Sequence, residues 1–191
     1  VECIFGSVKD EARRSRLERG RQRLWSLYAP ECHLCPVHCG VNRNAGVRGD
    51  CGLAQDTTVY RRQVHLGEEL ELIPSLAVWL AGCNFQCSFC SDEHALRPPL
   101  PGKSWSPEAF AELLFGDLTR QQTPLDNINF VGGEPGISLP WIADTAAALL
   151  ERATDSTPIP RLLLNTNGYL THGALSGALD VFDVFVIDDK F

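Results

Sequence analysis

The stretch "AGCNFQCSFCSDE", residues 81–93, places three cysteines in one short loop directly after the apolar run "SLAVWL". Cys83, Cys87 and Cys90 are one ligand short of a structural zinc site, which normally takes four protein ligands. An iron–sulfur cubane also usually takes four thiolates. Three thiolates would hold three irons of a cubane and leave the fourth open, as catalytic metal sites keep one position for substrate or water. The spacing therefore predicts a [4Fe–4S] site with chemistry at its open iron.

The same loop also has a simpler interpretation. The three cysteines could be small buried residues near the end of a strand, or His94 could complete a zinc site with them. The specific spacing, and the position of the loop after a predicted strand, favour the cluster.

The charge of the chain argues against a protein that works through bulk positive potential. Its 191 residues carry a formal net charge of -7, and 44% of them are hydrophobic, enough for one sizeable core. We therefore expect no nucleic-acid partner. Basic residues do cluster between Lys9 and Arg23, but Asp10, Glu11 and Glu18 lie among them. We expect a solvated amphipathic helix with a structural role there, with RNA binding as the alternative.

The chain lacks the sequence features of membrane and secreted proteins. No uncharged apolar stretch reaches transmembrane length, and the first residues do not resemble a signal peptide. We expect a cytoplasmic protein without a membrane partner. In a reducing compartment, cysteines gathered in two tight groups indicate metal binding and not disulfides. The chain has no methionine and begins at Val1, so we expect it to be part of a longer chain.

From Ser75 onward, short apolar runs alternate with helical patterns, which is typical of βα units in a parallel sheet. Strands are expected over residues 76–82, 126–135, 160–169 and 183–191. Helices are expected over residues 106–122, 139–153 and 171–179, the first with Ser106 as N-cap and Pro107 at its first position. Ligands in such folds bind at the carboxyl ends of the strands, which places candidate residues at 83, 132–135, 165–168 and 188–190.

The residue types at these strand ends suit a ligand with charged groups. Gly132 and Gly133 would let backbone approach a ligand without a Cβ atom in the way, although a glycine pair is also an ordinary turn signal. Glu134 could accept hydrogen bonds from an ammonium group, and Lys190 could pair with a carboxylate. Each is a weak indication alone, and their shared order after the cysteine loop strengthens it.

A second cysteine group precedes the loop in "CHLCPVHCGVNRNAGVRGDCG", residues 32–52. The stretch has the glycines that a tight metal knuckle needs. Either a structural zinc ion or an auxiliary iron–sulfur cluster would satisfy four thiolates, and ligand type does not separate the two. We expect His33 and His38 to lie outside the ligand set. The predicted metal ligands of this group are Cys32, Cys35, Cys39 and Cys51.

The segment "CNFQCSFC" resembles the CxxxCxxC signature of radical S-adenosylmethionine enzymes, including an apolar residue, Phe89, before the last cysteine. In that family the three cysteines bind a [4Fe–4S] cluster whose open iron is chelated by the amino and carboxylate groups of S-adenosylmethionine. The reduced cluster cleaves this cofactor to methionine and a 5′-deoxyadenosyl radical, which abstracts hydrogen from a substrate. The resemblance implies the same two cofactors here, and an electron donor such as flavodoxin or ferredoxin.

Later segments extend this resemblance. "GGEP" is similar to the family's GGE motif, which meets the cofactor's amino group, and "NTNG" resembles the segment that approaches the ribose and carboxylate. "IDDK" resembles the D-x-K segment of glycyl-radical-enzyme activases, which faces the methionyl part. Those activases often have aspartate where this chain has Asn165. The implied cofactor-binding residues are Phe89, Gly132, Gly133, Glu134, Pro135, Asn165, Asn167, Asp188 and Lys190.

The first cysteine group resembles the N-terminal segment of one branch of the family, whose members are similar to pyruvate formate-lyase-activating enzyme. In that branch the segment precedes the CxxxCxxC loop, with an intervening "GEE" like that at residues 67–69. Activases with ferredoxin-like extra clusters usually place those cysteines after the loop, so the order here favours the branch. "VGGEP" departs from the branch's sequence after the second strand.

These patterns and the resemblance predict an α/β fold, a partial (β/α) barrel of radical S-adenosylmethionine type in which four strands are visible and about six are expected. We expect a helical arm over residues 1–30, the metal knuckle over 31–56, a connecting segment over 57–74 and the barrel core over 75–191. The chain is expected to lack the C-terminal part of the barrel.

Two radical functions and one function from another class fit the sequence. The enzyme could activate a glycyl radical enzyme as its protein partner, or it could modify a small molecule or a protein or peptide side chain directly. The rival is a non-catalytic zinc-binding interaction module, which gives no reason for "GGEP" and "DDK" at strand ends. Fold analogy alone does not fix the substrate.

Overall fold

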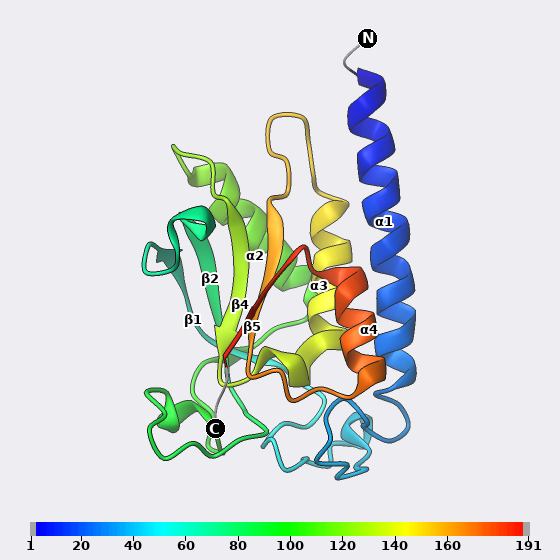
Figure 1. Ribbon diagram of the computed structural model, residues 1–191, viewed down its shortest axis with the longest axis vertical. Coiled ribbons are helices and arrows are strands. Elements are labelled where there is room, and N and C mark those ends of the chain that lie inside the picture. Colours follow the sequence, from blue (N-terminus) through cyan, green and yellow to red (C-terminus); the bar gives the residue numbers. More distant parts are fainter. Residues whose placement is uncertain (1–2, 189–191) are drawn as a thin grey trace.

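The computed structural model describes residues 3–188, with side chains from residue 11 onward. A six-stranded sheet runs through it in the order β3-β1-β2-β4-β5-β6 (Figure 1). Its parallel part consists of β2 (Ser75–Leu80), β4 (Asn127–Gly132), β5 (Arg161–Thr166) and β6 (Val184–Ile187). These are the four strands predicted from the alternation of apolar and helical patterns, and the prediction is confirmed.

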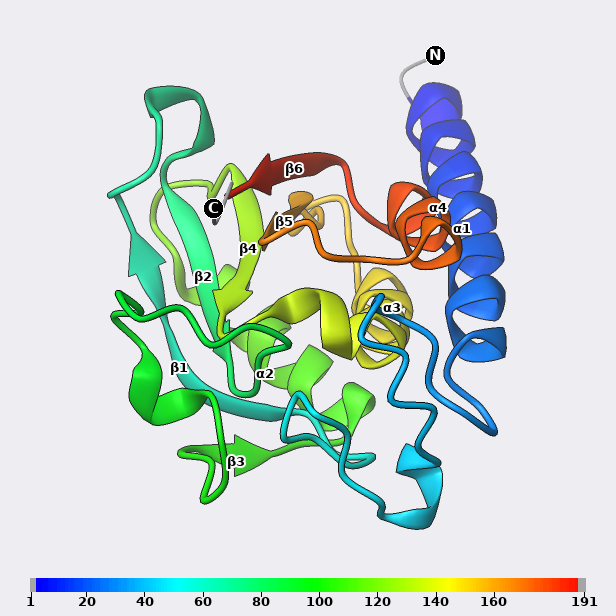
Figure 2. The same cartoon turned by 60° about the horizontal axis from the view of Figure 1, so that its bottom comes forward.

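Three helices connect the parallel strands: α2 (Pro107–Arg120), α3 (Leu139–Leu150) and α4 (His172–Val181). They lie on one side of the sheet (Figures 1 and 2). The hydroxyl of Ser106 caps α2 by accepting a 3.2 Å hydrogen bond from the backbone N–H of Ala109, as predicted. Thr171 caps α4 in the same way, through a 3.3 Å bond from Ala174.

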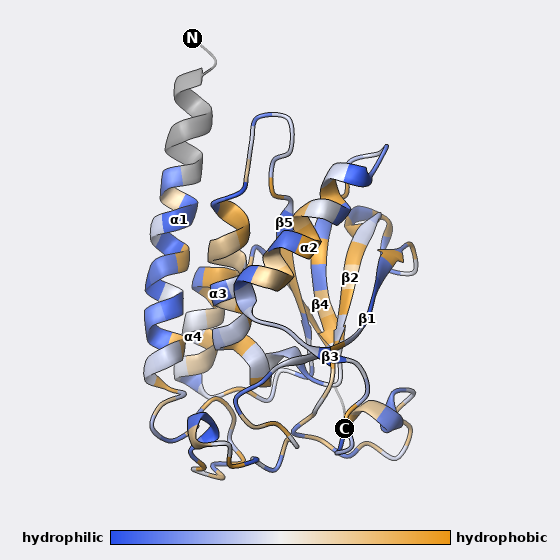
Figure 3. Cartoon of the chain, turned by 180° about the vertical axis from the view of Figure 1, so that it is seen from behind, coloured by the Kyte–Doolittle hydropathy of each residue, from blue (hydrophilic) through white to orange (hydrophobic). Residues whose placement is uncertain are grey.

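The main core forms between the sheet and these helices. Strand residues of even number, such as Leu76 and Val78 on β2 and Phe130 on β4, face the helices and pack in one cluster with Phe110 and Ile142. This alternation follows from the two-residue period of a strand. Apolar colouring accordingly concentrates on the central strands and on α3 (Figure 3).

Two strands were not predicted. β1 (Thr58–His65) pairs antiparallel with β2, and the short β3 (Lys103–Ser104) pairs with β1. β1 lies inside the segment expected to be a mere connection between residues 57 and 74. Its sequence "TVYRRQVH" carries polar residues because much of the strand is half-buried or exposed. In the described part of the chain the sheet is open, with β3 and β6 at its edges. The α/β class is confirmed, and the barrel type stays a prediction.

The N-terminal helix α1 (Cys3–Ser26) has a structural role, as expected, and keeps many of its residues exposed. It packs along α3 and α4, so closely that a Cβ atom on Gly20 would lie 2.8 Å from the carbonyl oxygen of Gly177. Arg13 and Arg16 both form ion pairs with Asp183. Arg19 and Arg21 pair with Asp180 and Asp144, so four arginines of α1 form ion pairs within the chain. Among the described helices, none is both long and apolar enough to cross a bilayer.

Candidate cluster and cofactor site

The cysteine loop begins directly at the end of β2. Gly82 has a φ of +88°, a conformation that favours glycine, and its N–H donates a 2.7 Å hydrogen bond to the carbonyl of Ala95. Cys83 is buried, with 6% of its surface exposed, and its sulfur accepts a 3.3 Å hydrogen bond from the backbone of Phe85. Cys87 and Cys90 are half-buried. The first thiol is thus fixed at the strand end, and the other two lie on a more accessible turn.

The loop after β4 lies directly against the loop after β2. The N–H of Gly133 donates to the carbonyl of Leu80, and the N–H of Glu134 donates to that of Gly82, both at 2.8 Å. A Cβ atom on Gly133 would lie only 2.0 Å from the oxygen of Gly82. The glycine pair was predicted to permit close approach to a ligand; in the structure it permits the close approach of these two loops.

Glu134 joins the ends of β4 and β5. Its side chain is buried, with 1% of the residue exposed. One carboxylate oxygen accepts 2.6 Å hydrogen bonds from the N–H of Gly136 and the hydroxyl of Thr166, and the other accepts a 2.8 Å bond from the N–H of Asn167. The carboxylate therefore holds two loops together. Its contact with the ammonium group of a cofactor stays a prediction.

Asn84 and Thr166 contribute to the site. Asn84 was not predicted, whereas Thr166 lies in the predicted stretch 165–168 without a role of its own. The side-chain amide of Asn167 donates a 2.9 Å hydrogen bond to Asn84, which donates a 3.1 Å bond to the carbonyl of Tyr169. Asn84 thereby links the loops after β2 and β5. Asn84 stands inside a motif that was recognised, "CNFQC", and this position was the only signal for it.

Most of the predicted site residues surround one cavity, of about 90 Å³, at the carboxyl ends of the parallel strands. The predicted residues that line it are Cys83, Cys87, Gly132, Gly133, Glu134, Asn165, Asn167 and Asp188. Cys90 and Pro135 do not line this cavity, and neither does Phe89, which is 67% exposed. Lys190 lies outside the described residues. The structure therefore brings together residues from four separate stretches of the sequence.

Burial controls the charge of the first thiol. It raises the pKa of Cys83 to about 11, an effect that the Phe85 N–H opposes and that the Glu134 carboxylate and Cys87 reinforce. The metal-free thiol is therefore protonated at neutral pH, and a bound metal has to displace that proton.

The first cysteine group surrounds a second, much smaller cavity of about 10 Å³. Burial raises the pKa of Cys35 and of Cys51. His38 also lines the cavity, whereas His33 lies outside it and 3.8 Å from Glu31. Four thiols around one small space fit a soft metal ion or cluster. In residues 3–188, however, neither cysteine group closes into a shell of three or more metal ligands. All four predicted cysteines line the cavity: Cys32, Cys35, Cys39 and Cys51.

Arg43 is a buried residue of the knuckle that the sequence did not reveal. Only 1% of it is exposed, and its guanidinium lies 4.7 Å from the ring centre of Tyr28. It donates hydrogen bonds of 2.9 Å to the carbonyl of Ala54 and 2.7 Å to that of Ile137. Ile137 follows Glu134 closely in the chain, so Arg43 connects the knuckle to the loop after β4.

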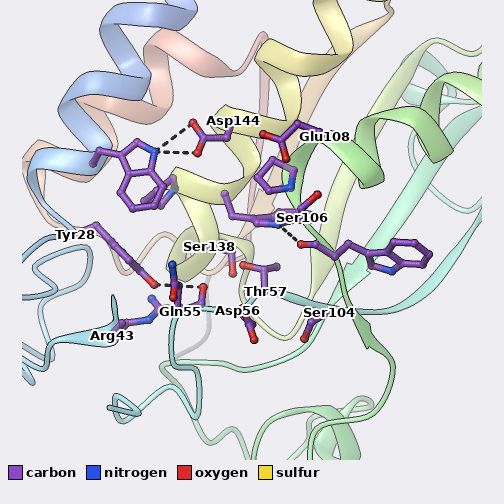
Figure 4. A pocket seen from close by; sticks show the side chains of 15 residues that line it. Tyr28, Arg43, Gln55, Asp56, Thr57, Ser104, Ser106, Glu108, Ser138 and Asp144 are labelled. Carbon is purple, nitrogen blue, oxygen red and sulfur yellow. Dashed lines mark hydrogen bonds between the residues drawn. The ribbon is translucent and has the colours of Figure 1, made fainter. Parts of the chain in front are cut away.

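A third cavity, of about 460 Å³, lies between the end of α1 and the starts of α2 and α3 (Figure 4). Its described lining contains none of the cysteines. The indole N–H of Trp25 donates to Asp144 at 3.1 Å, and that of Trp141 donates to the carbonyl of Trp105 at 2.9 Å. These polar groups are thus satisfied within the protein, and the cavity carries no functional assignment.

The chain belongs to the family of 4Fe-4S single cluster domains, whose model matches residues 74–191. The match includes the loop with Cys83, Cys87 and Cys90, and it begins after the first cysteine group. An uncharacterized protein of Methanocaldococcus jannaschii is 32% identical over 167 residues, which cover 84% of this chain and 45% of the relative. The chain therefore spans less than half the length of the curated relative that it matches.

Proposed function

We propose that this protein is a radical S-adenosylmethionine enzyme that works at the cavity beside the cysteine loop. The observation that supports the proposal most directly is the composition of this cavity. It unites Cys83 and Cys87 with the glycine pair at the end of β4, the asparagines at the end of β5 and Asp188 after β6. Membership of a 4Fe-4S family supports the cluster, and the order of the motifs along the chain supports the cofactor.

Cys83, Cys87 and Cys90 would hold the [4Fe–4S] cluster. The backbone N–H of Cys90 donates a 3.2 Å hydrogen bond to the carbonyl of Cys87, and this turn keeps the third thiol next to the second. Three thiols on one loop beside a cavity fit a cluster with an open iron. When bound, the cluster supplies the electron that cleaves S-adenosylmethionine to methionine and a 5′-deoxyadenosyl radical for hydrogen abstraction.

The other lining residues would bind and orient S-adenosylmethionine. Asn165 and Asn167 would offer their side-chain amides to the ribose and the carboxylate of the cofactor. The carboxylate of Asp188 and the ammonium group of Lys190 would face the methionyl part of the cofactor. Glu134 fixes the position of Asn167 through its backbone N–H. Because these groups come from three loops, the cofactor's orientation depends on how firmly the loops are held together.

The first test is anaerobic reconstitution of the chain with iron and sulfide. It is followed by reduction in the presence of S-adenosylmethionine and chromatography for 5′-deoxyadenosine. The proposal predicts about four irons at the three-cysteine loop and production of 5′-deoxyadenosine. Cys87→Ser should lose both. Ser88→Ala changes the exposed neighbouring residue and should keep both. A protein that binds zinc alone and cleaves no S-adenosylmethionine would instead be the zinc-binding interaction module.

For the substrate, we propose a glycyl radical enzyme, with flavodoxin or ferredoxin as the electron donor. The support is the resemblance of residues 187–190 to the activases and of the first cysteine group to the activase-like branch. With pyruvate formate-lyase as the probe, electron paramagnetic resonance should detect an organic radical on that protein. Abundant 5′-deoxyadenosine without such a radical would favour direct modification of a small molecule or a protein or peptide side chain.

A further inference from the structure

We propose that the four-cysteine knuckle binds one soft divalent cation of the zinc type, and that this cation holds the loops after β2, β4 and β5 in place. The second part deepens the proposed function, on which it rests, because those three loops form the cofactor cavity. The knuckle would then be a positioning element for the radical site and not a second redox centre.

The space between the thiols selects one ion over a cluster. The knuckle cavity measures about 10 Å³, close to the volume that a single water needs, whereas the cavity beside the cysteine loop measures about 90 Å³. The sulfurs of Cys39 and Cys51 both lie beside Gly49, where a Cβ atom would be 3.2 Å from one and 3.4 Å from the other, and both cysteines line the cavity. A zinc ion bonds sulfur at about 2.3 Å and closes such a space.

The knuckle contacts the cysteine loop through backbone. The N–H of Cys83 donates a 3.1 Å hydrogen bond to the carbonyl of Cys51, so a ligand of one predicted centre is bonded to a ligand of the other. A Cβ atom on Gly82 would lie 2.9 Å from the same carbonyl oxygen and 2.8 Å from the side chain of Leu53. The end of the knuckle is therefore packed tightly against the start of the cysteine loop.

The knuckle also contacts the other two loops. Arg43 reaches the loop after β4 through the carbonyl of Ile137. Thr171, at the end of the loop after β5, donates from its N–H to the carbonyl of Leu34 at 3.0 Å and from its hydroxyl to that of His33 at 2.9 Å. Asn84 connects the two centres, because it lines the knuckle cavity together with Cys35 and accepts a hydrogen bond from Asn167.

The structure of the knuckle depends on metal because the knuckle has little regular secondary structure. Among the described residues from 31 to 56, regular structure is limited to one short 3-10 turn, Arg43–Ala45. A segment with so little secondary structure is held mainly by its cross-link, and metal binding in such segments is coupled to folding. Loss of the cation would therefore loosen the knuckle. It would also weaken the hydrogen bonds that join Cys51, Arg43 and Leu34 to the three loops.

The test compares the reconstituted chain with Cys39→Ser, a substitution at a half-buried knuckle ligand. Zinc and iron are counted by elemental analysis. Backbone hydrogen exchange is followed by mass spectrometry without S-adenosylmethionine. We expect about one zinc beside about four irons in the parent chain and no zinc in Cys39→Ser. Exchange in residues 81–85, 133–138 and 165–171 should become at least about tenfold faster in the variant, with α2 unchanged.

Eight irons without zinc, or no metal at the knuckle, would overturn the single-ion assignment. Faster exchange confined to residues 31–56 would overturn the coupling. If Cys39→Ser fails to fold, Asn84→Ala tests the coupling. It should keep zinc and iron yet bring faster exchange in residues 165–171, while Asn44→Ala, at an exposed knuckle position, should not. Unchanged hydrogen exchange in Asn84→Ala would likewise overturn the coupling between the knuckle and the three loops. Because no readout uses S-adenosylmethionine, failure of the radical chemistry would show separately.

Discussion

The carboxylate of Glu134 accepts a 2.8 Å hydrogen bond from the backbone N–H of Asn167, which joins the loop after β4 to the loop after β5. Its other oxygen accepts bonds from Gly136 and from the hydroxyl of Thr166. A buried carboxylate is stable only when hydrogen bonds replace its lost hydration. The site therefore contains a charged residue whose first role is structural.

Glu134→Gln should destabilise the protein by about 1–3 kcal/mol, because an amide NH₂ would face a backbone or hydroxyl donor and leave it unsatisfied. Denaturant unfolding of the metal-free protein measures this loss. Glu112→Gln on the exposed surface of α2 is the matched control and should change stability by less than about 0.5 kcal/mol. Equal stability of the two variants would show that the Glu134 bonds do not hold the loops.

Gly133→Ala should disrupt the cavity, because its methyl group would lie 2.0 Å from the backbone oxygen of Gly82. Backbone atoms cannot give way as a flexible side chain can, so the loop has to move. We expect a less stable protein that no longer produces 5′-deoxyadenosine. Gly116→Ala provides the control: in α2 its Cβ atom would meet only the side chain of Arg120, at 3.5 Å. This change should be neutral or stabilise the helix by up to about 1 kcal/mol. Similar behaviour of both variants would argue against the close loop contact.

The sequence predicted the parallel strands well because burial leaves a clear pattern. β2 is buried along its whole length and reads as an uninterrupted apolar run. β1 escaped prediction because Arg61, Arg62 and Gln63 give it no apolar alternation, and its pairing with β2 is a tertiary contact. Strand propensity depends strongly on such context.

Cysteine spacing predicted the metal ligands, which stay predictions, but it did not predict the contacts between the two groups. Ligand spacing is local information, whereas the bond between Cys83 and Cys51 depends on how distant loops pack. Arg43 was missed for a similar reason, since an arginine in a loop is usually exposed. The glycine pair was predicted to approach a ligand, and that stays a prediction; both glycines line the cavity, and Gly133 packs against the backbone of Gly82.

Leu24→Ala should weaken the packing of α1, because Leu24 is fully buried and its side chain fills the space above Gly177 on α4. We expect a loss of about 2–5 kcal/mol, typical of a large-to-small change in a core. Denaturant unfolding followed by the fluorescence of the four tryptophans, which include the neighbouring Trp25, measures it. Leu179→Ala, at a 55% exposed position on α4, should have little effect. If Leu24→Ala were equally mild, α1 would be only loosely attached.

Arg43→Lys should destabilise the protein although it keeps the charge. The guanidinium donates through Nε to Ala54 and through Nη1 to Ile137, two carbonyls that a single ammonium group is not shaped to satisfy together. One buried acceptor would lose its partner, which costs about 1–3 kcal/mol in the free energy of unfolding. Arg48→Lys is the control, because this exposed arginine donates to one carbonyl, that of Gly52, which a lysine can also reach. An equally large stability loss in Arg48→Lys would mean that the two hydrogen bonds of the Arg43 guanidinium are not the reason for the effect of Arg43→Lys.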